Sequence, residues 1–159
     1  MNRYRIRSVT TPFVVALALV IGAQLPSMNS AAAAENFVAK TVKGPFDKVV
    51  TNLKREITAH KLVIVKQVPY QQMVKMVGVN AKPMMGFEIF HPRYGKVIYA
   101  KDVSAFKEVP LRILVRSSGN KVVLEYRKPS TLFAAYSGLS DLGEQLDQVL
   151  ADIVERVGK

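Results

Sequence analysis

The C-terminal end of the sequence carries its most regular hydrophobic pattern. Apolar side chains recur there at steps of three and four residues, at Leu139, Leu142, Leu146, Val149, Leu150, Ile153 and Val157. This spacing places them on one side of an α-helix, and such a helix needs an apolar surface on which to pack. Ser140 or Asp141 is expected to cap the helix, with Glu144 available for a capping box. The rest of the chain must therefore supply a sheet across which this helix can lie.

A second amphipathic stripe lies nearer the start of the chain. Its apolar residues are Phe46, Val49, Val50, Leu53 and Ile57. The stripe predicts a helix that ends at His60, where the helix dipole favours a histidine. A short helix is expected over residues 70–77, and we interpret residues 94–106 as a loop with a short helical piece.

Five segments have the composition and alternation of β-strands. They are Phe37–Lys43, Leu62–Val68, Gly86–His91, Val109–Arg116 and Lys121–Arg127. The order β-α-β-(α)-β-β-β-α predicts an α+β domain, in which a mainly antiparallel sheet of about five strands packs against two main helices on one face. A single domain accounts for residues 35–159 because that length forms one core.

The last two predicted strands form a hairpin around Ser117-Ser118-Gly119-Asn120. A two-residue and a four-residue loop give the same parity, so the same side chains share a face in both registers. The four-residue register sets Arg112 opposite Glu125 as an ion pair. The two-residue register sets two arginines opposite each other. We therefore favour the four-residue loop.

The N-terminus has the pattern of a signal peptide. Arg3, Arg5 and Arg7 precede a run of 13 uncharged residues, Phe13–Leu25. A membrane-spanning helix needs about 20 apolar residues, so the run is short for an anchor. Small residues then lead to an expected cleavage between Ala34 and Glu35. We expect a periplasmic or secreted protein, and a retained N-terminal anchor is the alternative.

Composition narrows the classes of function. The sequence has no cysteine, which excludes thiolate catalysis, thiolate metal sites and haem attachment. Removal of residues 1–34 would leave 20 basic against 12 acidic residues, a net charge of +8. This positive charge favours the binding of an anionic metabolite or of an envelope lipid surface. The alternative is that the basic residues form a solvated surface without such a partner. No nucleic-acid-binding motif is present, and we expect no nucleic acid partner.

One of the two histidines stands in the stretch FEIFHPRYGK, residues 87–96. On a regular strand Glu88 and His91 point to opposite faces, which argues against a Glu–His dyad or a shared metal site. Pro92 is expected to end strand pairing and to turn the chain. We expect no metal and no cofactor.

Several segments together resemble a bacterial family known as domain of unknown function 302. They are VKGPFDKVVTNLKREITAHKLVIV, FEIFHPRYGK, VPLRILV with SSGNKVVLEY and RKPS, and the long C-terminal helix, within residues 38–157. The resemblance implies a TATA-binding-protein-like α+β fold, in which a curved antiparallel sheet grips a long helix.

The resemblance also has departures. Members of the family often carry Cys-Asn-Pro where this chain has Phe90-His91-Pro92, and Leu-Pro-Cys where it has Val109-Pro110-Leu111. Both cysteines are missing here, so no thiol role is carried over. The shared prolines suit a structural corner, which places His91 at the mouth of a turn.

We expect a non-enzymatic exported binding module that captures a small or amphipathic anionic ligand between sheet and helix. The candidate lining residues combine aromatic and cationic groups: His91, Arg93, Tyr94, Tyr99, Arg112, Tyr126 and Tyr136. One alternative is a structural envelope protein that self-associates, for example as a homodimer, through an open sheet edge or apolar patch. A hydrolase that uses His91 is the third.

Overall fold

The structure is a computed structural model that describes residues 36–159. The predicted signal segment, residues 1–34, and its cleavage site lie outside the described residues. Within residues 36–159, no helix is both long enough and apolar enough to cross a membrane.

A single five-stranded sheet forms the centre of the fold. Its strands are β1 (Phe37–Lys43), β2 (Val63–Val68), β3 (Met84–Phe90), β4 (Leu111–Ser118) and β5 (Lys121–Arg127). Their order across the sheet is β1-β5-β4-β3-β2, and every neighbouring pair is antiparallel. The α+β class and the antiparallel sheet predicted from the sequence are thereby confirmed.

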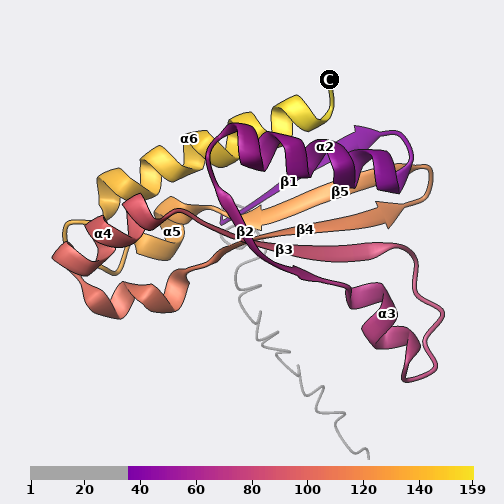
Figure 1. Ribbon diagram of the computed structural model, residues 1–159, viewed down its shortest axis with the longest axis horizontal. Helices are drawn as coiled ribbons and strands as arrows, with labels where there is room; N and C mark the ends of the chain where they lie inside the picture. The colour runs from indigo at the N-terminus through magenta and orange to yellow at the C-terminus, as the bar shows by residue number, and fades with distance from the viewer. Residues whose placement is uncertain (1–35) are drawn as a thin grey trace, which may run out of the picture.

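Two long helices, α2 (Phe46–Ala59) and α6 (Ser140–Val157), cover one face of this sheet. The shorter helices are α3 (Tyr70–Lys75), α4 (Pro92–Lys101), α5 (Pro129–Phe133) and the 3₁₀ helix η1 (Val103–Glu108). Helices α2 and α6 lie side by side over the sheet, as predicted (Figure 1). Helices α4 and α5 gather with η1 at one end of the molecule, whereas α3 lies at the other end (Figure 1).

The core fills the space between the sheet and its two long helices. Alternation along β3 buries Phe87 and Ile89 on the helix side, and α6 presents its predicted stripe to the same core. Beside His91 and Leu146, the space left at the start of α4 amounts to about 10 Å³. That volume holds at most one water molecule. The expected ligand site between sheet and helix is therefore not present at this position.

Polar contacts join α2 to α6 at the outer surface. The His60 ring, at the end of α2, lies 2.8 Å from an Asp152 carboxylate oxygen through Nε2. Arg156 also donates to Asp152, and the hydrogen bonds from Arg156 and then His60 lower the pKa of that carboxyl group. His60 is thus a helix-end residue that links the two helices.

Two local expectations were wrong. Residues 94–106 do not form a loop, because α4 and η1 occupy almost all of this segment. Pro92 begins α4 as its first residue, where the missing N–H costs nothing, and the segment then continues as helix. Helix α6 begins at Ser140 itself. Its N-cap is Leu139, which makes no side-chain capping bond.

The register of the β4–β5 hairpin also differs from the expectation. Ser118 pairs with Lys121, so the loop has two residues, Gly119 and Asn120. Gly119 has a φ of 61°, the positive value that a type II′ turn needs at its first central position. Leu114 consequently faces Glu125, the last pair of this ladder, and the register continued by two residues sets Arg112 level with Arg127. The two-residue register, which the ion-pair argument disfavours, is the one present.

The edge strand β2 contains an irregularity. Its pairing with β3 shifts register between Ile64 and Lys66, which leaves Val65 as an extra, exposed residue. The shift turns Ile64 toward the helices, whereas Lys66 and Val68 pair with Glu88 and Gly86 of β3. The second half of β2 therefore shows an apolar side chain to the side of the sheet without α2 and α6.

The position of α6 generates a stability prediction. Leu150 is 1% exposed in the interface between α6 and the sheet. Leu150→Ala should lower the free energy of unfolding by about 2–5 kcal/mol, because it removes buried methyl groups and leaves a cavity. Gln148→Ala, at an exposed position of the same helix, should change it by less than about 0.5 kcal/mol. Urea denaturation checks both values, and equal effects would contradict the packing of α6.

Candidate functional site

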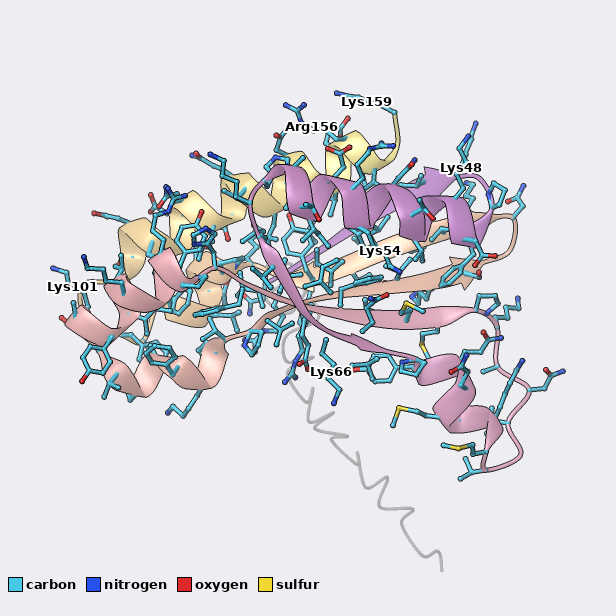
Figure 2. The ribbon with its side chains drawn as sticks, in the orientation of Figure 1. Lys48, Lys54, Lys66, Lys101, Arg156 and Lys159 are labelled. Carbon is cyan, nitrogen blue, oxygen red and sulfur yellow. The ribbon has the colours of Figure 1, made fainter. Side chains whose placement is uncertain are left out.

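The face of the sheet opposite α2 and α6 is the candidate site, and we call it the open face. Its side chains come from alternate positions of all five strands. They include Phe37, Ala39, Lys66, Val68, Met84, Gly86, Glu88, Arg112, Leu114, Val123, Glu125 and Arg127. Lys66 projects on this side, away from Lys48 and Lys54 on α2 (Figure 2). The open face is thus an apolar surface with charged groups at defined places.

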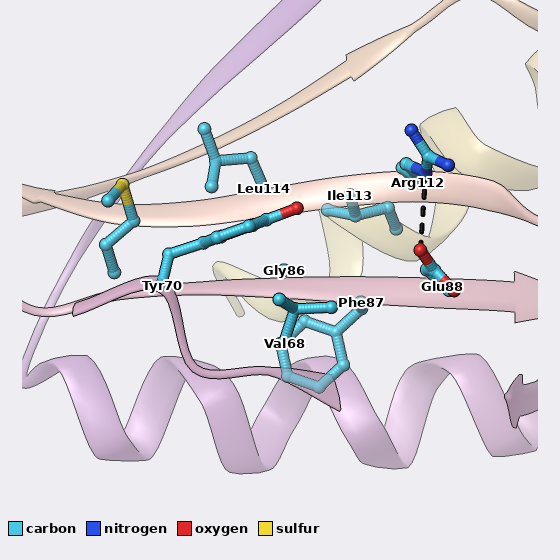
Figure 3. A pocket seen from close by; sticks show the side chains of 9 residues that line it. Val68, Tyr70, Gly86, Phe87, Glu88, Arg112, Ile113 and Leu114 are labelled. Carbon is cyan, nitrogen blue, oxygen red and sulfur yellow. Dashed lines mark ion pairs between the residues drawn. The ribbon is translucent and has the colours of Figure 1, made fainter. Parts of the chain in front are cut away.

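One half of the open face is hollowed into a pocket of about 370 Å³ over β2, β3 and β4. Its lining is mostly apolar and consists of Val68, Tyr70, Met84, Gly86, Phe87, Glu88, Arg112, Ile113 and Leu114. The Tyr70 side chain extends along the pocket, with its hydroxyl on the side of Glu88 and Arg112 (Figure 3). A pocket of this size is within the range of small-molecule sites.

Gly86 makes room for the Tyr70 ring. A Cβ atom at Gly86 would lie 2.6 Å from Tyr70 Cε2, closer than real atoms approach. The absence of a side chain therefore lets the aromatic ring lie directly on β3, and the ring in turn covers the exposed backbone. Tyr70 is the first residue of α3, so this helix supplies one wall of the pocket.

The other half of the open face continues the hollow. A second pocket, of about 470 Å³, lies over β1, β5 and β4. It shares Arg112 and Leu114 with the first pocket and adds Phe37 and Ala39. The guanidinium of Arg127 lies 5.8 Å from the centre of the Phe37 ring, in cation–π contact. The two pockets form one shallow groove across the sheet.

Three cations gather at one end of this groove. Lys107, Arg112 and Arg127 line a further hollow of about 150 Å³, together with Glu108, Pro110 and Leu132. We call the three cations the cationic cluster. Two carboxylates lie beside it, Glu88 at 3.4 Å from Arg112 and Glu108 in the lining of the hollow. Glu108 accepts a hydrogen bond of 2.7 Å from the Tyr136 hydroxyl, and this bond is the largest cause of the raised pKa of Tyr136. The cluster thus retains positive charge beside an apolar floor.

The ion pairs of the open face leave Arg112 only weakly engaged. Its Nε lies 3.4 Å from Glu88 Oε1, and its side chain is 73% exposed. Glu125, which the expected register assigned to Arg112, instead binds Arg116 through two hydrogen bonds of 3.0 and 2.6 Å. These bonds lower the pKa of Glu125 and raise the pKa of Arg116. Arg112 therefore has donor groups available for an external anion.

Four of the predicted site residues lie on or beside α4, away from the groove. His91 caps this helix, with its Nδ1 accepting a hydrogen bond of 2.9 Å from the Arg93 amide. Tyr94 is buried in the core, edge-on to the His91 ring, and Arg93 stacks over it. Tyr99 is 74% exposed. Within residues 36–159, no hydrogen bond or ion pair joins His91 to a carboxylate.

The other three predicted residues are divided between core and surface. Tyr126 is a core residue, and burial, followed by the charge of Asp147, raises its pKa to about 12. Tyr136 is half-buried beside Glu108 at the rim of the cationic cluster. Arg112 stands in the groove, and Tyr126, although buried in the core, borders the second pocket. Tyr94 lines neither pocket of the groove.

Sequence reasoning missed most of the groove. Arg127 and Lys107 were not among the candidates, nor were Tyr70, Gly86 and Leu114. One signal was present: Gly-Asn between two strands is typical of a two-residue hairpin, which sets Arg112 level with Arg127. No group of three or more His, Asp or Glu residues in the described part of the chain is arranged to hold a metal ion.

Comparison with known proteins places the chain in a family. The sequence model of the family described as domain of unknown function DUF302 matches residues 38–157. The chain belongs to the DUF302 family. A crystal structure of an uncharacterized conserved DUF302 protein from Bacillus stearothermophilus is similar, with a TM-score of 0.72, 14% sequence identity, and coverage of 76% of this chain and 97% of that chain. At this identity the likeness shows the fold of the DUF302 domain alone. No curated protein matches the chain.

The Arg116–Glu125 pair generates a pH prediction. Because the folded pKa of Glu125 is lowered, the pair stabilises the protein above the ordinary pKa of glutamate, and this contribution is lost as the pH falls through the folded pKa. Glu125→Gln should cost up to about 1 kcal/mol at neutral pH, a limit set by the partial exposure of the pair. The difference from the wild type should shrink as the pH falls through the folded pKa of Glu125 and vanish below it.

Glu144→Gln is the matched control for this prediction. Glu144 is exposed on α6 and takes part in no ion pair among the contacts of residues 36–159. Unfolding by urea at a series of pH values measures the profiles. A Glu125→Gln penalty that persisted unchanged at low pH would show that the glutamate acts through packing rather than charge.

Proposed function

We propose that the protein is an exported, non-enzymatic binding protein whose open face holds an amphipathic anion. The observation that carries the proposal is the meeting of Lys107, Arg112 and Arg127 at one end of an apolar groove. In this arrangement the acyl or aromatic part of a ligand lies along the sheet, and its anionic group lies among the three cations.

The cost of the cationic cluster supports this role. Like charges at level positions of neighbouring strands repel each other and destabilise the sheet. An anion that binds between Arg112 and Arg127 removes this repulsion and accepts charge-assisted hydrogen bonds from their guanidinium groups. Binding of an anion therefore relieves a charge repulsion that destabilises the free protein.

The apolar floor supports the second part of the proposal. Leu114 lies at the junction of the two pockets, with Phe37 on one side and Val68 on the other. A simple inorganic anion would leave this surface in contact with water. A ligand with a hydrocarbon portion would cover it and gain about 25 cal/mol for each Å² of apolar surface removed from water.

Titration calorimetry with laurate below its micelle concentration tests the proposal. Laurate should bind saturably, and Arg112→Ala with Arg127→Ala should weaken binding by about 10- to 100-fold, because hydrogen bonds to charged groups contribute about 1.5–3 kcal/mol. Dodecylammonium, with the same chain and the opposite charge, should not bind at the site.

Arg55→Ala is the matched control. Arg55 is an exposed arginine on α2, on the other side of the sheet, and its loss removes one positive charge, as each of the two substitutions in the groove does. Laurate affinity should stay within about twofold of the wild type in this variant. Equal weakening by Arg55→Ala, or equal binding of dodecylammonium, would contradict the proposal.

The natural ligand and the export of the protein can be examined in one measurement. Native mass spectrometry of protein isolated from its own cells should show an added mass that organic solvent releases. The denatured mass should correspond to a chain that begins at Glu35. A full-length mass would contradict cleavage and favour the retained anchor.

Self-association is the competing proposal for the open face. A second copy could cover the same apolar surface, and light scattering distinguishes the two ideas. A dimer that laurate does not dissociate, and that Leu114→Arg does dissociate, would favour the structural role. A monomer that binds laurate favours ligand capture.

A further inference from the structure

The segment that joins β2 to β3 exposes a group of large apolar side chains. Met76 and Val77 are 79% and 78% exposed, and Met73 and Val79 are about half exposed. No residue of α3 is buried. We call these four side chains, with Lys75 and Lys82, the α3 tip. Burial in a core does not account for this apolar group.

The α3 tip stands apart from the body of the domain. It lies at the end of the sheet opposite α4 and η1, away from the layer formed by α2 and α6 (Figure 1). Its attachment is through Tyr70, whose ring lies on Gly86, and through contacts of α3 with β3. The tip can therefore reach a flat surface before the long helices would meet it.

The charge around the tip has one sign. From Ile57 through Phe87 the sequence contains no Asp or Glu, whereas it contains Lys61, Lys66, Lys75 and Lys82. Two of these lysines lie within the tip itself. Apolar side chains flanked by lysine and free of carboxylates match an anionic bilayer, in which the thioether and valine groups enter the headgroup boundary and the ammonium groups meet lipid phosphates.

We propose that the α3 tip docks the protein on anionic lipid bilayers. Met73, Met76, Val77 and Val79 enter the interface, and Lys75 and Lys82 bind lipid headgroups. A protein partner of this surface would need matching carboxylates and a complementary apolar pocket, whereas a bilayer supplies both components without a defined shape.

Docking would also orient the groove, a consequence that rests on the proposed function. Tyr70 and Met84 flank the tip and line the apolar end of the groove. The β3–β4 register places Met84 opposite Arg116 and Glu88 opposite Arg112, so the cationic cluster lies toward the other end. A docked molecule would hold the apolar end of its groove beside the bilayer.

Sedimentation with vesicles tests the docking. Vesicles of equal parts phosphatidylglycerol and phosphatidylcholine should bind the wild-type protein, and vesicles of phosphatidylcholine alone should bind it weakly. Met76→Asp with Val77→Asp should reduce the partition coefficient at least about tenfold. Lys75→Gln with Lys82→Gln should reduce it several-fold and weaken its dependence on salt.

Matched controls lie away from the tip, one in η1 at the other end of the molecule and one on α2 in the helix layer (Figures 1 and 2). Val103, the first residue of η1, is 61% exposed, so Val103→Asp places a carboxylate on an accessible apolar site outside the tip. Lys48→Gln with Lys54→Gln removes two lysines from α2 (Figure 2). Both controls should keep at least about half of the wild-type partition coefficient, since neither touches the tip. All variants carry the same N-terminus, and thermal unfolding confirms that each is folded.

The vesicle and laurate measurements separate the two proposals. Arg112→Ala with Arg127→Ala should bind vesicles like the wild type but lose laurate, whereas Met76→Asp with Val77→Asp should bind laurate but lose vesicles. Equal vesicle binding by the tip variant and the wild type would overturn the docking. Conversion of a dimer to a monomer by the tip substitutions, without an effect on vesicles, would also overturn it and assign the tip to a second copy.

Discussion

The packing of α2 and α6 on the same face of the sheet determines what the opposite face can be. Both long helices bury their apolar stripes against Phe87, Ile89 and their neighbours, which uses one set of alternate side chains from each strand. The other set has no helix to cover it. In β4 this second set contains Arg112 and Leu114, a cation and an apolar group side by side. The open face is therefore a direct result of one-sided packing.

The parts of the fold that depend on periodicity could be predicted from the sequence. The stripe of α6 and the alternation in β3 and β5 are long enough to identify both the element and its buried side. Helix α4 is predicted only as a short helical piece within a loop, because its start combines a histidine cap with Pro92 at the first position, and a short helix after a strand resembles a loop in composition. Tyr126 alternates with Val122 and Leu124 along β5, so its burial follows from the strand pattern alone.

The site was harder to predict because it depends on register and on contacts between distant segments. The Arg112–Glu125 pair favours the four-residue loop, whereas the turn preference of Gly119-Asn120 favours the two-residue loop. A partly exposed ion pair is worth at most about 1 kcal/mol, which is too little to choose a register. The structure keeps the turn and joins Glu125 to Arg116 instead. No sequence pattern around Lys107 of η1 or Tyr70 of α3 indicates that these residues reach the groove, since each comes from a segment outside the hairpin.

The bulge in β2 restricts how copies of this chain can assemble. A regular edge strand offers an unbroken row of amide and carbonyl groups, to which a strand of another molecule can add. In β2 the extra residue Val65 interrupts that row, and Lys66 follows at once with a charge. Extension of the sheet from molecule to molecule is thereby discouraged at this edge, even though Val63 and Val65 are exposed. A chain without cysteine can in this way keep an uncovered sheet and still avoid growth into fibres.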